Sequence, residues 1–275
     1  MSRLFPDRLL IGLAPDALTL VRVSGGARAR VADKRTVACD PASGKEPWES
    51  AAGALSKLAE ELAKLSARVT VVLSNHFARY ALVPWNESLA KADEEAAFAR
   101  YCFAKIHGER SKDWDLRLSP AQSGTARVAS AVDAPLVEAV RSAFSSRAKL
   151  VSLQPYLMSA FNHARRQLAG ARAWFLLVER DRTCLARLEG GRFAAVRNAR
   201  GSLDGPEQWA GLLDRERHLA GGEPETEDVY VHAVSGLDAS PVRVGAWSFR
   251  SLPPAPAEGL SPADSAPYAL ALSAL

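Results

Sequence analysis

Residues 10–24 read Leu-Ile-Gly-Leu-Ala-Pro-Asp-Ala-Leu-Thr-Leu-Val-Arg-Val-Ser, and residues 175–189 read Phe-Leu-Leu-Val-Glu-Arg-Asp-Arg-Thr-Cys-Leu-Ala-Arg-Leu-Glu. The two stretches align without a gap. Each contains an apolar run, a polar turn that ends in Asp16 or Asp181, and a second apolar run. This pattern predicts two β-hairpins of the same design.

The match continues beyond the turns. Arg22 and Arg187 occupy the same place in the second run, and Gly-Gly follows each stretch, at 25–26 and 190–191. The paired glycines predict a turn into a third strand. Self-similarity at a fixed offset favours an internal duplication. The alternative is that two β-meanders of separate origin resemble each other.

Composition limits the classes of function. The chain has 275 residues and 48% of them are hydrophobic, enough for one large domain or two lobes with a substantial core. The net charge of +4 comes from 35 basic and 31 acidic residues without a dense basic run. Nucleic-acid binding is therefore not expected. The mild basic bias is compatible with an anionic membrane surface.

Cysteine usage and hydropathy indicate a compartment. The three cysteines, Cys39, Cys102 and Cys184, lie far apart, which favours a reducing cytoplasm over a disulfide framework. The sequence shows no signal-peptide pattern, and no run approaches the ~20 apolar residues of a membrane helix. We therefore expect a cytoplasmic protein, peripheral to a membrane only through its partners.

Hydrophobic periodicity predicts a repeated order of elements, interrupted once. In the first part, the periodicity predicts three meandering strands, an amphipathic helix, a parallel strand and, later, a further strand and helix. These elements span residues 8–14, 17–23, 28–37, 50–65, 69–73, 150–153 and 155–168. Between them, residues 75–148 form an α+β insert. Its predicted strands and helices span residues 77–83, 88–107, 115–118, 126–132 and 135–146.

The second part repeats the plan without an insert. Its predicted elements are strands 174–178, 184–188 and 192–196, a helix from Pro206, strands 229–231 and 242–247, and a closing helix at 264–275. The closing helix is small and apolar, as expected for tight packing on a sheet. The predicted domains are therefore a first lobe, 1–169, interrupted by the insert, and a second lobe, 170–275.

This α/β order resembles the actin-like fold, a duplicated ribonuclease H-like fold of two lobes with an α+β insert in the first. The run Val83-Pro84-Trp85-Asn86-Glu87 before a long helix resembles the insert of the PilM proteins of type IV pilus assembly. It also resembles the cytoplasmic part of GspL from type II secretion. The runs at 131–137, 150–155 and 268–275 follow the same pattern.

The resemblance implies a nucleotide site and shows how this sequence departs from it. In PilM-like proteins the first hairpin carries Asp-x-Gly and a downstream Lys. A glycine turn exposes N–H groups to phosphate, and a carboxylate holds the metal. Here Gly12 stands at the Asp position, Ala14 at the Gly position and Thr19 at the Lys position.

The other two nucleotide elements depart from the family pattern as well. Leu177 and Glu179 replace the Asp and Gly of the second hairpin, and Ala233 and Val234 replace the Gly-Gly that receives adenosine. Glu179 puts an acidic side chain where phosphate would bind. We therefore expect a vestigial site with no cofactor, no metal and no catalytic residue.

Two functions remain open. The resemblance implies a non-catalytic scaffold of a pilus or secretion platform. It would bind the cytoplasmic tail of an inner-membrane partner, with a contact to an assembly ATPase and a homodimer left open. Tyr80, Trp85 and Phe98 are the aromatic candidates for that contact, although core packing also explains each. The alternative is an active ATPase or kinase.

The enzyme would need other carboxylates. Asp16, Asp181 or Glu179 would have to replace the missing metal ligand. The two aspartates could also act as a general acid and base. The alternative explanation is that Asp is simply favoured in turns.

Overall fold

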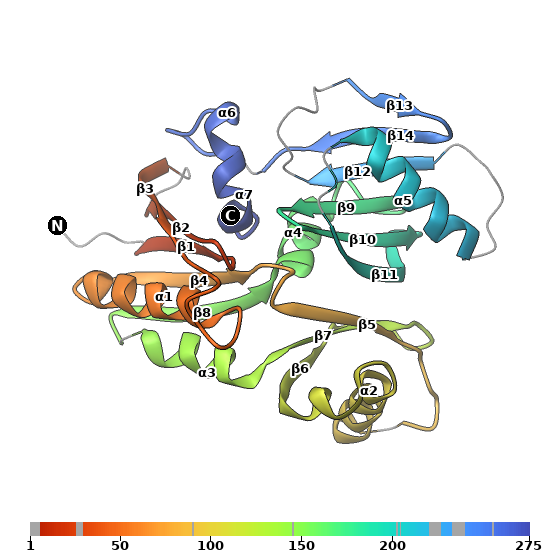
Figure 1. Cartoon of the computed structure of the whole chain (residues 1–275), viewed down its shortest axis with the longest axis horizontal. Coiled ribbons are helices and arrows are strands. Elements are labelled where there is room, and N and C mark those ends of the chain that lie inside the picture. The colour runs from red at the N-terminus through yellow and green to blue at the C-terminus, as the bar shows by residue number, and fades with distance from the viewer. Residues whose placement is uncertain are drawn as a thin grey trace. The chain divides into compact units, whose positions relative to one another are not determined.

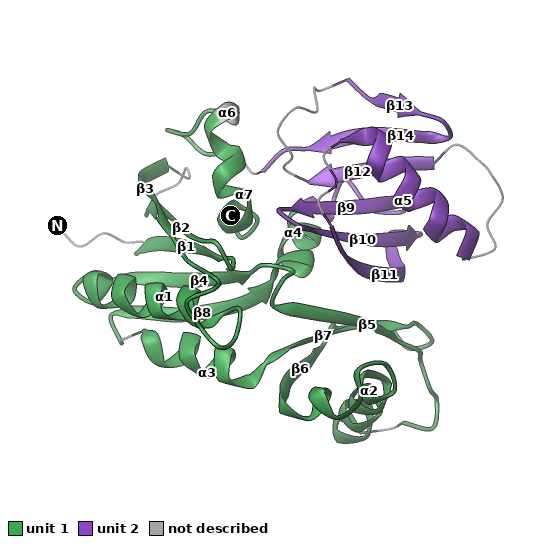
Figure 2. Cartoon of the chain, viewed as in Figure 1, with its two compact units in different colours: residues 1–163, 255–275 green, residues 164–254 purple. Residues whose placement is uncertain are grey.

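The computed structural model describes residues 6–25, 30–89, 91–144, 146–201, 203, 205–219, 227–232, 240–254 and 256–275. The chain forms two compact units, one of residues 1–163 with 255–275 and one of residues 164–254 (Figures 1 and 2).

The first unit contains a five-stranded sheet in the order β3-β2-β1-β4-β8. An antiparallel meander forms one half, and two parallel strands extend it on the other side of β1. The strands are β1 (Asp7–Leu13), β2 (Ala17–Ser24), β3 (Arg30–Ala38), β4 (Ala67–Leu73) and β8 (Ala148–Pro155).

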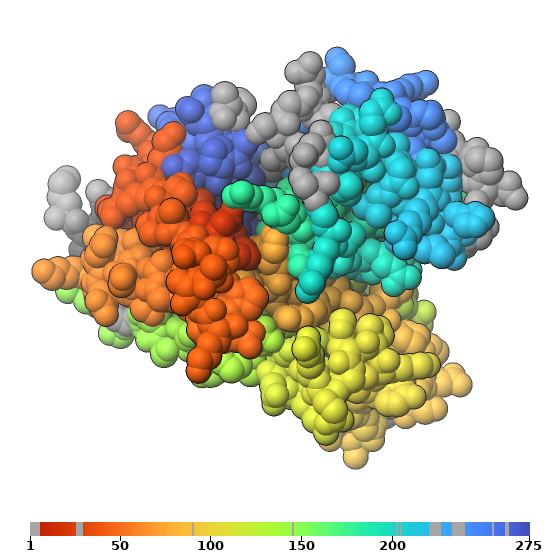
Figure 3. Space-filling view, viewed as in Figure 1, coloured from red at the N-terminus to blue at the C-terminus, as the bar shows by residue number. Residues whose placement is uncertain are grey.

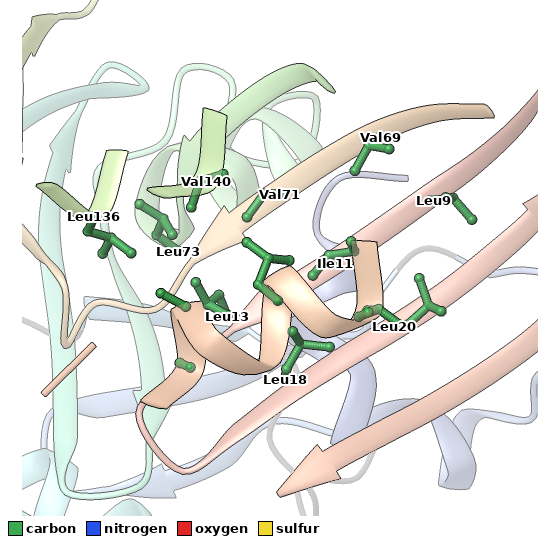
Figure 4. Packing of buried hydrophobic residues seen from close by; sticks show 14 of the residues in the cluster. Leu9, Ile11, Leu13, Leu18, Leu20, Val69, Val71, Leu73, Leu136 and Val140 are labelled. Atoms are coloured by element: carbon green, nitrogen blue, oxygen red, sulfur yellow. The ribbon is translucent and has the colours of Figure 1, made fainter. Parts of the chain in front are cut away.

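The two faces of this sheet bury alternate residues of β1, as the period of two in a strand requires. Leu9, Ile11 and Leu13 pack under α1 (Glu49–Leu62) and α3 (Ala134–Ala143) (Figure 4). Leu10 faces the opposite way and packs with the closing helix α7 (Ala269–Leu272). Both faces of β1 are thus buried, which explains its nearly continuous apolar sequence.

The insert has its own antiparallel sheet, in the order β5-β7-β6. Phe103 of its long helix packs edge-on against Trp114, with ring centroids 6.2 Å apart, in a separate small core. The elements are β5 (Ala78–Val83), α2 (Ala92–His107), η1 (Gly108–Asp113), β6 (Trp114–Leu118) and β7 (Arg127–Asp133); α4 (Tyr156–Ala164) follows β8.

The second unit is a six-stranded sheet in the order β11-β10-β9-β12-β14-β13. Trp174, Trp209, Trp247 and Phe249 are the large side chains of its core. The elements are β9 (Ala173–Glu179), β10 (Arg182–Glu189), β11 (Arg192–Arg200), α5 (Pro206–Leu219), β12 (Glu227–His232), β13 (Val242–Val244) and β14 (Trp247–Leu252).

The two hairpins match in register as well as in sequence. Gly12 pairs with Thr19, and Leu177 pairs with Cys184, at the corresponding places. In both meanders the register to the third strand shifts immediately after the shared arginine, Arg22 or Arg187. A bulge is a local departure that two unrelated meanders have no reason to share. These observations favour the duplication.

Two elements differ from the expectation. The strand expected at 242–247 is a hairpin, because Gly245, at φ +56°, turns the chain between β13 and β14. The closing segment consists of α6 (Pro262–Ser265), η2 (Ala266–Tyr268) and α7. It belongs to the first compact unit, where Ala271 and Leu272 cover Leu10. The lobe boundary at 169/170 stays a prediction.

Candidate functional site

The β1–β2 turn carries the first nucleotide-loop positions, and its backbone groups are already used. The Ala14 N–H donates to the Ala17 carbonyl oxygen at 2.9 Å, which closes the hairpin. The Leu13 carbonyl oxygen accepts from Ser74 N at 2.9 Å and ties the turn to the end of β4. The N–H at the family's glycine position is therefore committed within the protein.

Gly12 is buried, and the space that a side chain would need is filled. A Cβ at this position would lie 2.6 Å from Thr19 Oγ1, 2.9 Å from Leu270 Cγ and 3.1 Å from the Ala271 backbone N. The first two distances are shorter than nonbonded Cβ atoms show, and the third is tight. The closing helix thus occupies the place where the family's aspartate would project.

Thr19 lies across the hairpin from Gly12 and is also buried, with 7% of its surface exposed. Its hydroxyl oxygen has no hydrogen-bond partner in the described part of the chain. A threonine lacks both the length and the charge with which lysine reaches a phosphate. Gly12 and Thr19 therefore lie together but supply no positive charge for a phosphate.

The second hairpin is equally apolar at the matching position. Leu177 and its partner Cys184 are fully buried. Burial raises the pKa of the Cys184 thiol well above its ordinary value, and the charge of Glu179 raises it further. The thiol therefore stays protonated and is not a nucleophile. Ala233 and Val234 lie outside the described residues.

The turn aspartates Asp16 and Asp181 have a structural role in their own units. Their backbone oxygens accept from Cys39 N at 2.8 Å and from Gly201 N at 3.1 Å, so each closes its meander just past the third strand. Asp181 also adopts φ +56°, a conformation that Asp tolerates better than most residues. Within the described residues no group of three His, Cys, Asp or Glu side chains could hold a metal ion.

A polar group that the sequence analysis missed lies at the carboxyl end of β4. Ser74 and Asn75 are fully buried, and Ser74 Oγ lies 2.9 Å from His76 Nδ1. Asn75 Oδ1 accepts from the Tyr80 hydroxyl at 2.7 Å. The signal was the polar run directly after a buried parallel strand, where ligands commonly bind in α/β sheets. Here the run joins the sheet to the insert.

Tyr80 is thus a structural residue of this junction. Its hydroxyl oxygen also lies 3.4 Å from Leu157 N, at the start of α4, and its ring contacts the main core of the first unit. We expect Tyr80→Phe to lower the free energy of unfolding by about 1 kcal/mol, the net value of a buried hydrogen bond. Urea denaturation measures this loss; an unchanged midpoint would contradict the structural role.

Trp85 and Phe98 lie together, as parts of one surface pocket of the insert. Val83, Pro84, Leu89 and Leu118 complete its apolar lining. The charged lining consists of Glu95 and Arg127, which form an ion pair at 2.7 Å.

Exposed apolar groups continue from this pocket. Trp85 is 47% exposed, and Tyr101, which stacks on Phe98 with centroids 6.3 Å apart, is 61% exposed. Helix α2, which carries Phe98 and Tyr101, is open to the surface (yellow in Figure 3). Large exposed aromatic side chains around a pocket are typical of sites that bind other proteins. We therefore treat the Trp85–Phe98 pocket as the candidate functional site.

No protein-family model and no curated protein matches this sequence. Solved structures do resemble it. One is a protein of unknown function with an actin-like ATPase fold from Bacteroides thetaiotaomicron, 10% identical, with a TM-score of 0.59 over 84% of this chain and 83% of that one.

In the part of the chain that the structure describes, no helix is both long and apolar enough to cross a membrane.

Two further similar structures come from assembly machines. A PilM–PilN type IV pilus biogenesis complex is 20% identical, with a TM-score of 0.54 over 84% of this chain and 82% of that one. The cytoplasmic domain of EpsL, an inner-membrane component of the Vibrio cholerae type II secretion system, is 12% identical, with a TM-score of 0.51 over 82% and 81%. The groups that the sequence resembles are thus among its structural neighbours, and the chain has the actin-like fold.

Proposed function

We propose that the chain is a non-catalytic cytoplasmic scaffold of an inner-membrane platform that assembles a type IV pilus or a type II secretion system. The observation that supports the absence of catalysis in this proposal is that the closing helix fills the space beside Gly12. No room is left there for a metal-binding carboxylate. The similarity to the PilM–PilN complex and to EpsL supports the assembly role.

The partner in this proposal is the cytoplasmic tail of a membrane protein, bound at the Trp85–Phe98 pocket. The half-exposed indole of Trp85 and the apolar side chains beside it suit a surface contact with apolar residues of an extended tail. Tyr80 is left out of this proposal, because it is not among the residues that line the pocket and its hydroxyl donates to Asn75.

Nucleotide binding separates the scaffold from the alternative, an ATPase or kinase. A ligand that binds only the folded state raises the thermal midpoint, so an active site would show itself at Mg-ATP concentrations far above its Kd. We expect no shift of the midpoint with Mg-ATP. A reproducible rise, together with ATP hydrolysis, would replace the scaffold by the enzyme.

Partner binding is tested in the host cell with a photo-crosslinking amino acid. The residue replaces Trp85 in one strain and Val151, an exposed residue of β8, in a control strain. We expect the Trp85 strain to yield an adduct with one membrane protein, identified by mass spectrometry through its cytoplasmic tail. Adducts of equal yield at Val151, or none at Trp85, would contradict the proposed surface.

A further inference from the structure

Three basic side chains begin the three parallel strands of the first sheet. Arg8 of β1 pairs with Arg68 of β4, and Arg68 pairs with Lys149 of β8. Directly paired residues of neighbouring strands lie about 5 Å apart and point to the same face. This basic row, Arg8, Arg68 and Lys149, therefore places three positive charges side by side, an arrangement that by itself destabilises a sheet.

Only the first charge of the basic row has compensation within the described residues. Arg8 donates to the Ala274 and Leu275 carbonyl oxygens, at 2.9 and 3.1 Å, at the end of the closing helix. Burial lowers the pKa of Arg8, and the positive charge of Arg68, its paired residue on β4, lowers it further. Arg68 and Lys149 are exposed and have no ion pair in the described part of the chain.

Further basic residues reach the same edge from the connections. Lys64 lies in the loop between α1 and β4, and Arg147 lies beside the start of β4, because its backbone oxygen accepts from Ala67 N at 3.1 Å. Both are exposed. The amino-terminal edge of the parallel strands thus collects positive charge from strands and loops alike.

Two carboxylates in this part of the unit are paired with basic residues outside the basic row. Asp7 binds Arg22 at 2.6 Å, and Glu61 binds Arg35 at 3.2 Å. Exposed cations spread along the starts of several strands suit a surface of many anions better than one enclosed ligand.

We infer that the basic row binds anionic phospholipid headgroups, so that this edge of the first sheet contacts an anionic membrane leaflet directly. The inference rests on the proposed function, because a platform scaffold works beside the inner membrane. It adds a direct contact to the contact through a partner. Each basic residue near an anionic surface strengthens binding by about fivefold, and salt screens the attraction.

The test is flotation of the purified full chain with vesicles. One set is pure phosphatidylcholine and the other also contains phosphatidylglycerol. Arg68→Gln with Lys149→Gln removes two exposed charges of the basic row. The matched control, Lys57→Gln with Lys105→Gln, removes two exposed charges from helices elsewhere, which also have no ion pair in the described part of the chain. Inorganic phosphate is added as a competitor at constant ionic strength.

We expect the chain to bind the phosphatidylglycerol vesicles and not the pure phosphatidylcholine vesicles. The basic-row variant should bind about thirtyfold more weakly, since two charges are lost, and the control variant should stay closer to the parent. Equal loss in both variants would show a mere net-charge effect and overturn the inference. Specific displacement by phosphate would overturn it as well, because it would reveal a discrete phosphate site.

These outcomes are separate from those of the proposed function. The vesicle experiment contains no partner protein, so its failure leaves the Trp85 cross-link standing. Conversely, loss of the cross-link leaves vesicle binding by the basic row intact.

Discussion

Gly12→Asp, which restores the family's metal-binding residue, is expected to lower the free energy of unfolding by at least about 4 kcal/mol. The new Cβ would meet Thr19 Oγ1 at 2.6 Å and Leu270 Cγ at 2.9 Å, and a charged carboxylate would be placed at a buried, packed position. The closing helix would have to move away from β1. Urea denaturation of the purified chain measures the loss.

A matched pair of alanine variants isolates the steric part of this effect. Gly12→Ala should cost about 2 kcal/mol, because it overfills a packed position. Gly53→Ala should instead stabilise by up to about 1 kcal/mol, since nothing lies within 4 Å of a Cβ at this helical glycine. If Gly12→Asp stayed as stable as the parent and its midpoint rose with Mg-ATP, the vestigial site would be the wrong proposal.

Trp85→Ala is expected to weaken binding of the cross-linked partner's tail about thirtyfold, the effect of removing an aromatic anchor. Its stability should stay within about 0.5 kcal/mol of the parent, because nearly half of Trp85, 47%, is already exposed. Fluorescence anisotropy with a labelled tail peptide measures the affinity.

Two control variants define the specificity of this result. Ile106→Ala removes an exposed apolar side chain of α2 outside the pocket lining and should leave the affinity unchanged. Tyr80→Phe should lower stability and leave the affinity close to that of the parent. A loss of affinity as large for Ile106→Ala as for Trp85→Ala would indicate a diffuse apolar contact and not the pocket.

The repeated hairpins could be predicted because their signals are local. Two short apolar runs on either side of the polar turn at Asp16 define β1 and β2 within a few residues, and the ungapped match extends the same prediction to β9 and β10. The register in which Gly12 pairs with Thr19 was not predicted, because it depends on the length of the loop that the hairpin adopts.

The remaining features depend on contacts between distant residues. A short apolar helix fits any sheet, so nothing local indicated that Ala271 and Leu272 cover Leu10 and not the second sheet. Asn75, the partner of Tyr80, is close to it in sequence. Its role became clear only because the structure places it at the buried end of β4. Gly245 was a visible turn signal inside an apolar run, and the strand period around it hid the break.

The destination of the closing helix has a consequence for the order in which the protein is made. All residues of the second unit are synthesised before residues 269–272, which complete the first. During synthesis, the sheet face that carries Leu10 and Val21 therefore stays uncovered until the closing helix has been made. The second unit can already fold by then. One face of the first strands to be synthesised is therefore among the last parts of the first unit to be covered.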